Sequence, residues 1–155
     1  MYSKNQNSMA QKEIKKDVSF EGLNKFLRQN KKVDWQTINL VDKKVNDTLN
    51  WKGLEDNQED VLKKVKGYQR MVRLLGEDNP KIIKALLKNN IHSAVQIAAM
   101  TQKGFIEKST KIFKNDDEYI IELHKKATAI RSKLLLRYVE YTQNREPHTT
   151  QVKTL

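Results

Sequence analysis

The sequence predicts an all-α fold: a single compact bundle of six or seven helices with a long C-terminal helix and flexible termini. Apolar residues recur at steps of three and four along most of the chain, which is the period of an amphipathic helix. Only 5 glycines and 2 prolines interrupt the 155 residues, and this scarcity favours helices over strands. Capping residues stand directly before several periodic segments, where helices begin.

The length and the composition indicate one domain with polar ends. A chain of this length can bury about 68–70% of its unfolded surface, so it needs no disulfides, and the sequence has no cysteine. We interpret residues 1–17 as a flexible leader, 18–142 as the helical domain and 143–155 as a flexible tail. No stretch approaches the roughly 20 apolar residues of a membrane span, and no signal peptide is recognisable. We therefore expect a cytoplasmic chain before assembly; if it leaves the cell, then a dedicated machine, lysis or export as part of a complex must release it.

The first two helices are predicted over residues 20–30 and 34–49. Ser19 is the expected cap of the first, whose apolar stripe is Phe20, Leu23, Phe26 and Leu27. Asp34 is the expected cap of the second, with a hydrophobic staple between Val33 and Ile38. The stripe of the second helix is Trp35, Ile38, Val41, Val45 and Leu49. A loop around Gly53 is predicted over residues 50–58.

The third and fourth predicted helices are joined by a short turn at residues 76–79. The stripe of the third is Val61, Leu62, Val65, Tyr68, Val72 and Leu75. Gly76 follows it, where a left-handed residue commonly ends a helix. Asn79 caps the fourth helix and Pro80 takes its first position, where a missing N–H costs nothing. Its inward side chains are Ile82, Ile83, Leu86 and Leu87.

The segment NNIHSAVQIAAM, residues 89–100, predicts a tight corner between the fourth and fifth helices. Asn90 can take the left-handed conformation, and Ser93 with Gln96 forms a capping box. The fifth helix is nearly all apolar, so we expect it to be buried on most sides. Thr101 then begins a sixth helix, whose apolar residues are Phe105 and Ile106, followed by Ile112 and Phe113.

The last predicted helix runs from about Asp116 to Tyr141 and is about 40 Å long. Acidic residues in its first turn suit the positive end of the helix dipole. Its stripe is Tyr119, Ile120, Leu123, Ala127, Ile130, Leu134, Tyr138 and Tyr141.

The chain carries a formal net charge of +11. Such a charge favours association with nucleic acid, an anionic membrane or an acidic protein. The lysines are scattered over all segments, however, which is also typical of a basic protein whose charges only keep it soluble.

No residues are predicted to be catalytic, to bind a metal or to hold a cofactor, so an enzyme is not expected. His92, His124 and His148 lack the spacing of metal ligands. The acidic clusters at residues 55–60 and 115–118 lie where helices begin, and capping explains them.

The candidate interaction residues are mostly basic and come from two segments, the basic and aromatic stretch 61–70 and the corner with the helix before it. They are Lys63, Lys64, Tyr68, Arg70, Lys84, Lys88 and His92. Two interpretations of the corner stay open. It is either a place where helices pack, or a helix-hairpin-helix-like contact for DNA or RNA, although Asn89 and Asn90 stand where glycines would let a phosphate approach.

The order of motifs between Asn50 and Tyr141 resembles the helical region of the A component of insecticidal toxin complexes. It is also similar to the related virulence-plasmid and neuraminidase-like-domain toxin proteins of bacteria. The recurring pattern is Tyr-Gln-Arg, a hairpin with Ser-Ala, an Ile-Ala pair, a Phe, and an Ala that follows a His. The matching positions are Tyr68, Gln69, Arg70, Ser93, Ala94, Ile97, Ala98, Phe105, His124 and Ala127.

The resemblance implies a non-enzymatic helical module of a toxin-delivery or injection apparatus. The implied partner is a larger protein of that assembly, and the oligomeric state stays open. The chain lacks the long pore helix, the pore-tip loop and the receptor-binding β domain of that family, so it is not expected to form a channel by itself. We expect a piece of a larger protein or a small relative that docks on a larger machine.

Overall fold

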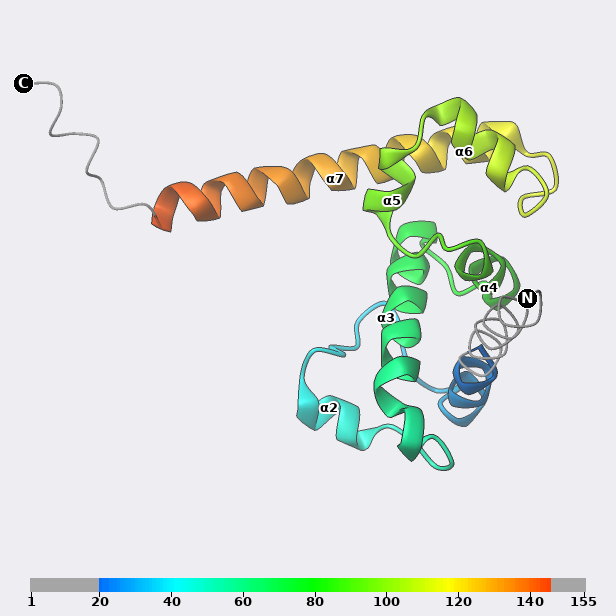
Figure 1. The fold of residues 1–155 in the computed structure, drawn as a ribbon, viewed down its shortest axis with the longest axis vertical. Coiled ribbons are helices and arrows are strands. Elements are labelled where there is room, and N and C mark those ends of the chain that lie inside the picture. The colour runs from blue at the N-terminus through cyan, green and yellow to red at the C-terminus, as the bar shows by residue number, and fades with distance from the viewer. Residues whose placement is uncertain (1–19, 146–155) are drawn as a thin grey trace, which may run out of the picture.

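The computed structural model describes residues 20–145, and the regular structure within them is entirely helical (Figure 1). A helix over residues 20–29 comes first. It is followed by α2 (Lys43–Thr48), the 3₁₀-helix η1 (Glu55–Asn57), α3 (Gln58–Leu75), α4 (Pro80–Lys88), α5 (Ala94–Ala99), α6 (Gln102–Ser109) and α7 (Asp117–Arg145). The predicted fold class, with its long C-terminal helix, is confirmed. The leader predicted over 1–17 lies outside the described residues, and the tail predicted from 143 begins with three residues of α7.

Helix α3 lies at the centre of the fold, with α4 and residues 20–29 beside it (Figure 1). Its predicted stripe is the buried one, since Val61, Val65, Tyr68 and Val72 have almost no exposed surface. The helix ends as predicted at Gly76, which has a φ of 77° and donates its N–H to the Val72 carbonyl. The apolar face of this amphipathic helix of 18 residues is thus packed against the rest of the fold.

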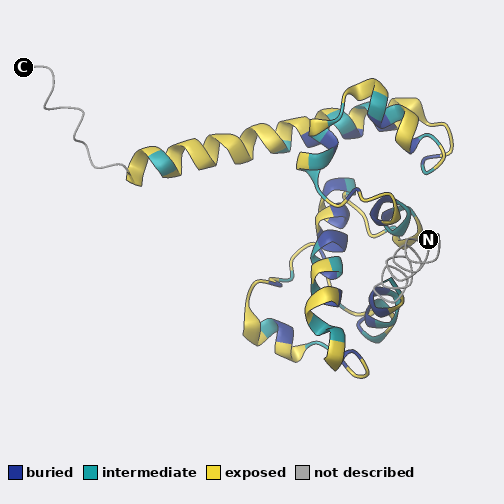
Figure 2. Cartoon of the chain, in the orientation of Figure 1, coloured by how far each residue is buried: buried dark blue, intermediate teal, exposed yellow. Residues whose placement is uncertain are grey.

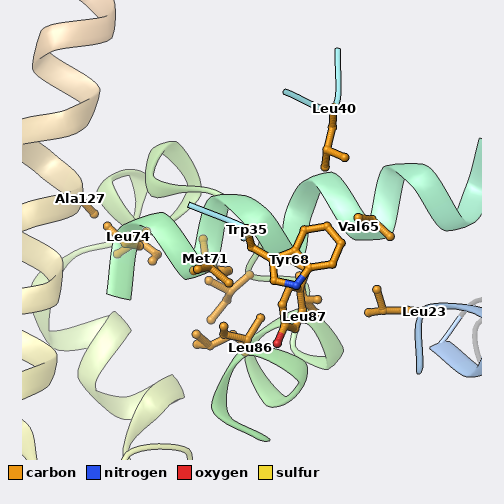
Figure 3. Close-up of a cluster of buried hydrophobic side chains, with 14 of the residues drawn as sticks. Leu23, Trp35, Leu40, Val65, Tyr68, Met71, Leu74, Leu86, Leu87 and Ala127 are labelled. Atoms are coloured by element: carbon orange, nitrogen blue, oxygen red, sulfur yellow. The ribbon is translucent and has the colours of Figure 1, made fainter. Parts of the chain in front are cut away.

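The core contains a chain of aromatic rings that joins the N-terminal helix to α3. The ring of Phe26 lies 4.5 Å from Trp51 and 6.0 Å from Trp35, measured between centroids. Trp35 in turn meets Tyr68 edge-on at 6.2 Å. Figure 3 shows Trp35 and Tyr68 next to each other, with Leu86 and Leu87 of α4 below them and Leu23 of the first helix to the right. Such pairs stabilise a core by roughly 0.5–1.5 kcal/mol beyond the area that they bury.

The helix predicted over residues 34–49 is wrong for its first half. Only Lys43–Thr48 are helical, and the N-cap is Asp42, whose carboxylate accepts the Lys44 N–H. The Asp34 carboxylate accepts the Gln36 N–H and the Thr37 hydroxyl, so it caps a turn and not a helix. Short polar side chains of this kind offer the backbone an alternative to helical hydrogen bonds.

A side chain of α3 donates hydrogen bonds to backbone carbonyls that would accept helical N–H groups if residues 34–42 were helical. The side-chain amide of Gln69 donates to the carbonyls of Trp35 and Ile38. Since no helix begins at Asp34, the staple predicted between Val33 and Ile38 has no helix start to close, although both side chains are partly buried against the core. Val41, which was expected on the buried stripe, is 83% exposed.

The corner at residues 89–93 has the predicted backbone. Asn90 is left-handed, with a φ of 59°, and the N–H of Gln96 donates to the Ser93 hydroxyl. The Gln96 side chain accepts a second free amide, that of His92, at 2.8 Å. The expectation that α5 is buried on most sides is wrong, because only Ile97 is buried in it and Val95 is exposed.

Candidate interaction surface

The first half of α7 is held against the fold by α5 and α6. Ile120, Leu123 and Ala127 are the buried residues of the helix. The His124 ring lies 6.0 Å from Phe105, and its Nε2 is 2.8 Å from the Met100 carbonyl oxygen. The predicted stripe of this half is therefore confirmed at Ile120, Leu123 and Ala127, whereas Tyr119, which was also expected on it, is exposed.

The second half of α7, residues 131–145, projects away from the fold, and all of its residues except the half-buried Thr142 are exposed (Figures 1 and 2). We call these residues the distal segment. Six of its large apolar side chains are between 46% and 65% exposed. They are Leu134, Leu135, Leu136, Tyr138, Val139 and Tyr141. The prediction that the stripe continues into the core through Leu134, Tyr138 and Tyr141 is therefore wrong.

The difference in helix lengths explains why the distal segment stays uncovered. Helix α7 has 29 residues and is about 44 Å long, whereas α5 and α6 have 6 and 8 residues and are only about 9 and 12 Å long. Two such short helices can cover only the first turns of α7. An apolar stripe on a helix predicts burial only where another element reaches it.

Leu135, Leu136 and Val139 were not predicted as functional residues, because they lie off the stripe expected for this helix. Successive residues of a helix are turned by about 100°, so Leu134, Leu135 and Leu136 point in three directions. The sequence held this signal, since three consecutive leucines cannot share one face of a helix.

The distal segment is also strongly basic. It carries Arg131, Lys133, Arg137 and Arg145 but only one acidic residue, Glu140. Among residues 20–145 the single ion pair joins Lys125 to Glu122, so none of these five charges is neutralised by a contact in the fold. The Arg145 guanidinium lies 4.9 Å from the centre of the Tyr141 ring.

The structure places some of the candidate interaction residues in two adjoining groups near the corner. Lys64 and Lys88 both lie over the Phe20 ring, with their Nζ atoms 4.6 and 6.0 Å from its centre. Arg70 donates from Nε to the His92 carbonyl at 2.9 Å. We call Lys64, Arg70, Lys88 and His92 the basic corner.

The charge of the basic corner acts on its histidine. Partial burial lowers the pKa of His92, and the positive charges of Arg70 and Lys64 lower it further. Positive charges that disfavour protonation of His92 also favour a bound anion, so an anion beside the basic corner would be stabilised there.

Two further candidate interaction residues, Lys63 and Lys84, make no such contact at the basic corner. Lys63 is exposed and Lys84 is half-buried, and within residues 20–145 neither side chain makes a hydrogen bond or an ion pair.

Tyr68 lies in the core, where its hydroxyl donates to the Asp78 carboxylate. Burial raises the pKa of Tyr68, and the hydrogen bond to Asp78 raises it further. The prediction that Tyr68 is a surface contact is therefore wrong, because its ring is covered by Trp35 and neighbouring core residues.

Two other kinds of site are absent from residues 20–145, a metal site and a membrane span. No three His, Asp or Glu side chains of residues 20–145 converge so that they could hold a metal ion. No helix in this range is both long enough and apolar enough to cross a membrane. Comparison of the chain with protein-family models, with curated proteins and with solved structures finds no match.

Proposed function

We propose that this chain is a non-enzymatic helical interaction module, which binds a larger protein of a bacterial toxin-delivery or injection apparatus through the distal segment of α7. The observation that carries the proposal is the exposure of six large apolar side chains on a helix that projects from the fold. Contiguous exposed apolar surface on a soluble domain is typical of a site that another molecule covers.

The resemblance to toxin components supports the choice of assembly. Half of its ten matching positions, among them Ile97, Phe105 and Ala127, are buried, so they support a shared way of packing helices. In that family such helices belong to the shell of a large complex. A small module of this kind acts by docking, and the distal segment offers the surface.

Site-specific crosslinking in the producing bacterium tests this proposal. A photoreactive amino acid at position 135 of the full chain is expected to capture a component of a toxin or secretion assembly. The matched control carries the same amino acid at position 111, an exposed lysine in the turn between α6 and α7. Capture of no such component from position 135, or equal capture from both positions, would contradict the proposal.

The basic corner supports a second candidate function, binding of DNA or RNA. Its cations lie together beside the corner of α4 and α5, and phosphate contacts depend on such groups. Anisotropy of a labelled duplex at about 50 mM salt tests it, because non-specific binding has a Kd of roughly 10⁻⁴–10⁻⁶ M at higher, physiological salt.

Two variants of equal net charge distinguish DNA binding through the basic corner from attraction of DNA by the net positive charge of the whole protein. One replaces Lys64, Arg70 and Lys88 with glutamine, and the other replaces Arg131, Lys133 and Arg137. DNA binding through the corner requires that the first variant lose affinity and the second retain it.

A further inference from the structure

We propose that the partner of the distal segment is a different protein, which receives this helix in an apolar groove with an acidic rim. The inference rests on the proposed function, since it specifies the chemistry of the surface that covers the same residues. Three features of the segment lead to it: the spacing of its apolar residues, their spread around the helix, and its charge.

The exposed apolar residues form two rows with the spacing of groove anchors. Leu134, Tyr138 and Tyr141 stand at positions i, i+4 and i+7, and Leu135 and Val139 stand at i and i+4 of the adjacent row. Helices that bind in grooves present anchors at these intervals. Tyrosines are also enriched in protein interfaces, where the ring is buried and the hydroxyl keeps a polar partner.

The spread of these residues favours a groove over a flat surface. At about 100° per residue, the six side chains from Tyr141 to Leu136 cover roughly 220° of the circumference. A helix that lies on a membrane confines its apolar residues to one face. A surface that covers more than half of a helix has to enclose it from two sides.

The positive charge of the distal segment indicates that the rim of the partner's groove is acidic. Lys133, Arg137 and Glu140 lie on the strip that the apolar residues leave free, and Arg131 and Arg145 lie within the apolar arc. Four basic residues against one acidic residue leave a net charge of +3 on 15 residues. Like charges brought together across an interface oppose binding, so a second copy of this helix is a poor occupant. Carboxylates on the rim would complement these cations.

Binding of two synthetic helical hairpins to the full chain tests the inference. Both hairpins present the same leucine-lined groove, but one has glutamates along the rim and the other has lysines. We expect the glutamate hairpin to bind at least about tenfold more tightly than the lysine hairpin, with an advantage that shrinks as salt is raised. Equal binding of the two, or binding of neither, would overturn the proposal.

A pair of variants places the binding on the distal segment. Leu135→Glu with Val139→Glu adds two negative charges to the exposed apolar surface and is expected to lose binding of the glutamate hairpin by at least about tenfold. Thr128→Glu with Ala129→Glu adds the same charge to exposed positions of the first half of α7 and is expected to bind like the wild type. Circular dichroism compares the helix content of both variants, and loss of binding in the control variant alone would place the site elsewhere.

Two further measurements test the alternatives to an acidic protein partner, a second copy of this chain and a membrane. Sedimentation that reveals a dimer abolished by the Leu135→Glu, Val139→Glu variant would replace the acidic partner with a second copy. Retention of the chain by phosphatidylglycerol vesicles, without binding to the glutamate hairpin, would replace it with a membrane. If the hairpins fail while crosslinking from position 135 still captures a toxin component, the acidic groove is wrong and the proposed function stands.

Discussion

The side-chain amide of Gln69 in α3 donates a hydrogen bond of 2.6 Å to the backbone carbonyl of Ile38, 31 residues earlier in the chain. The same amide donates to the Trp35 carbonyl at 3.1 Å. One buried side chain thus holds the irregular segment 34–42 against the central helix.

Replacing Gln69 with methionine should destabilise the fold by about 2–4 kcal/mol, because two carbonyls near the core lose their donor. Urea unfolding measures the change. Arg73→Met is the control, since Arg73 also donates to the Gln36 carbonyl but is exposed, and water can replace it. A similar loss in both variants would show that the burial of Gln69 does not matter.

Tyr68→Phe should cost about 1–2 kcal/mol near neutral pH, since the variant loses the hydrogen bond to Asp78. The pKa of Tyr68 is raised in the folded state, whereas an unfolded tyrosine ionises at about pH 10. The contribution of Tyr68 is therefore complete below pH 10 and is lost as the pH rises above it. Unfolding curves at pH 8 and pH 10.5 should show that the difference between wild type and variant narrows at the higher pH; a constant difference would contradict this.

Arg70→Gln should raise the pKa of His92, because one of the positive charges that lower it is removed. A folded-state pKa below the ordinary value of about 6.5 means that His92 contributes stability above that pH, and that the contribution is lost as the pH falls below it. Titration of the imidazole signals by NMR measures the shift. Arg131→Gln removes an equal charge from the distal segment and should leave the pKa of His92 where it is.

Ser93→Ala should destabilise the fold by about 1 kcal/mol, since the Gln96 N–H loses its acceptor at the start of α5. Ser132→Ala is the matched control. Its hydroxyl donates only to the Thr128 carbonyl on the exposed side of α7, so its loss should change the stability by less than about 0.5 kcal/mol. Thermal unfolding distinguishes the two, and equal melting temperatures would argue against a stabilising cap at Ser93.

Leu123→Ala and Leu135→Ala should separate the two halves of α7. Leu123 is buried against the fold, so its truncation should cost about 2–4 kcal/mol, whereas Leu135 is half-exposed and should cost less than about 1 kcal/mol. Urea unfolding of the isolated chain is the measurement. A large cost at Leu135 would mean that the distal segment is already covered by this chain or by a second copy.

The basic corner could be predicted only in part from the sequence. Lys88 and His92 lie beside a turn that local chemistry specifies, whereas Lys64 and Arg70 belong to α3 and are brought to His92 by packing. The exposure of the distal segment was signalled only by the three consecutive leucines at 134–136, which cannot share one face of a helix. Leu134, Tyr138 and Tyr141 continue the same periodic stripe as Leu123 and Ala127, and periodicity is identical whether or not a neighbour covers it.

The sequence by itself determined what depends on neighbouring residues: helix periods, the caps at Asn79 and Ser93, and the left-handed positions at Gly76 and Asn90. These features follow from interactions within a few residues, so they can be read without the fold. Only the tertiary structure decided that Gln69 takes the carbonyls of Trp35 and Ile38, and that α5 and α6 are too short to cover α7. Both outcomes depend on segments far apart in the chain, and no local pattern records which distant segment will be near or how far it will reach.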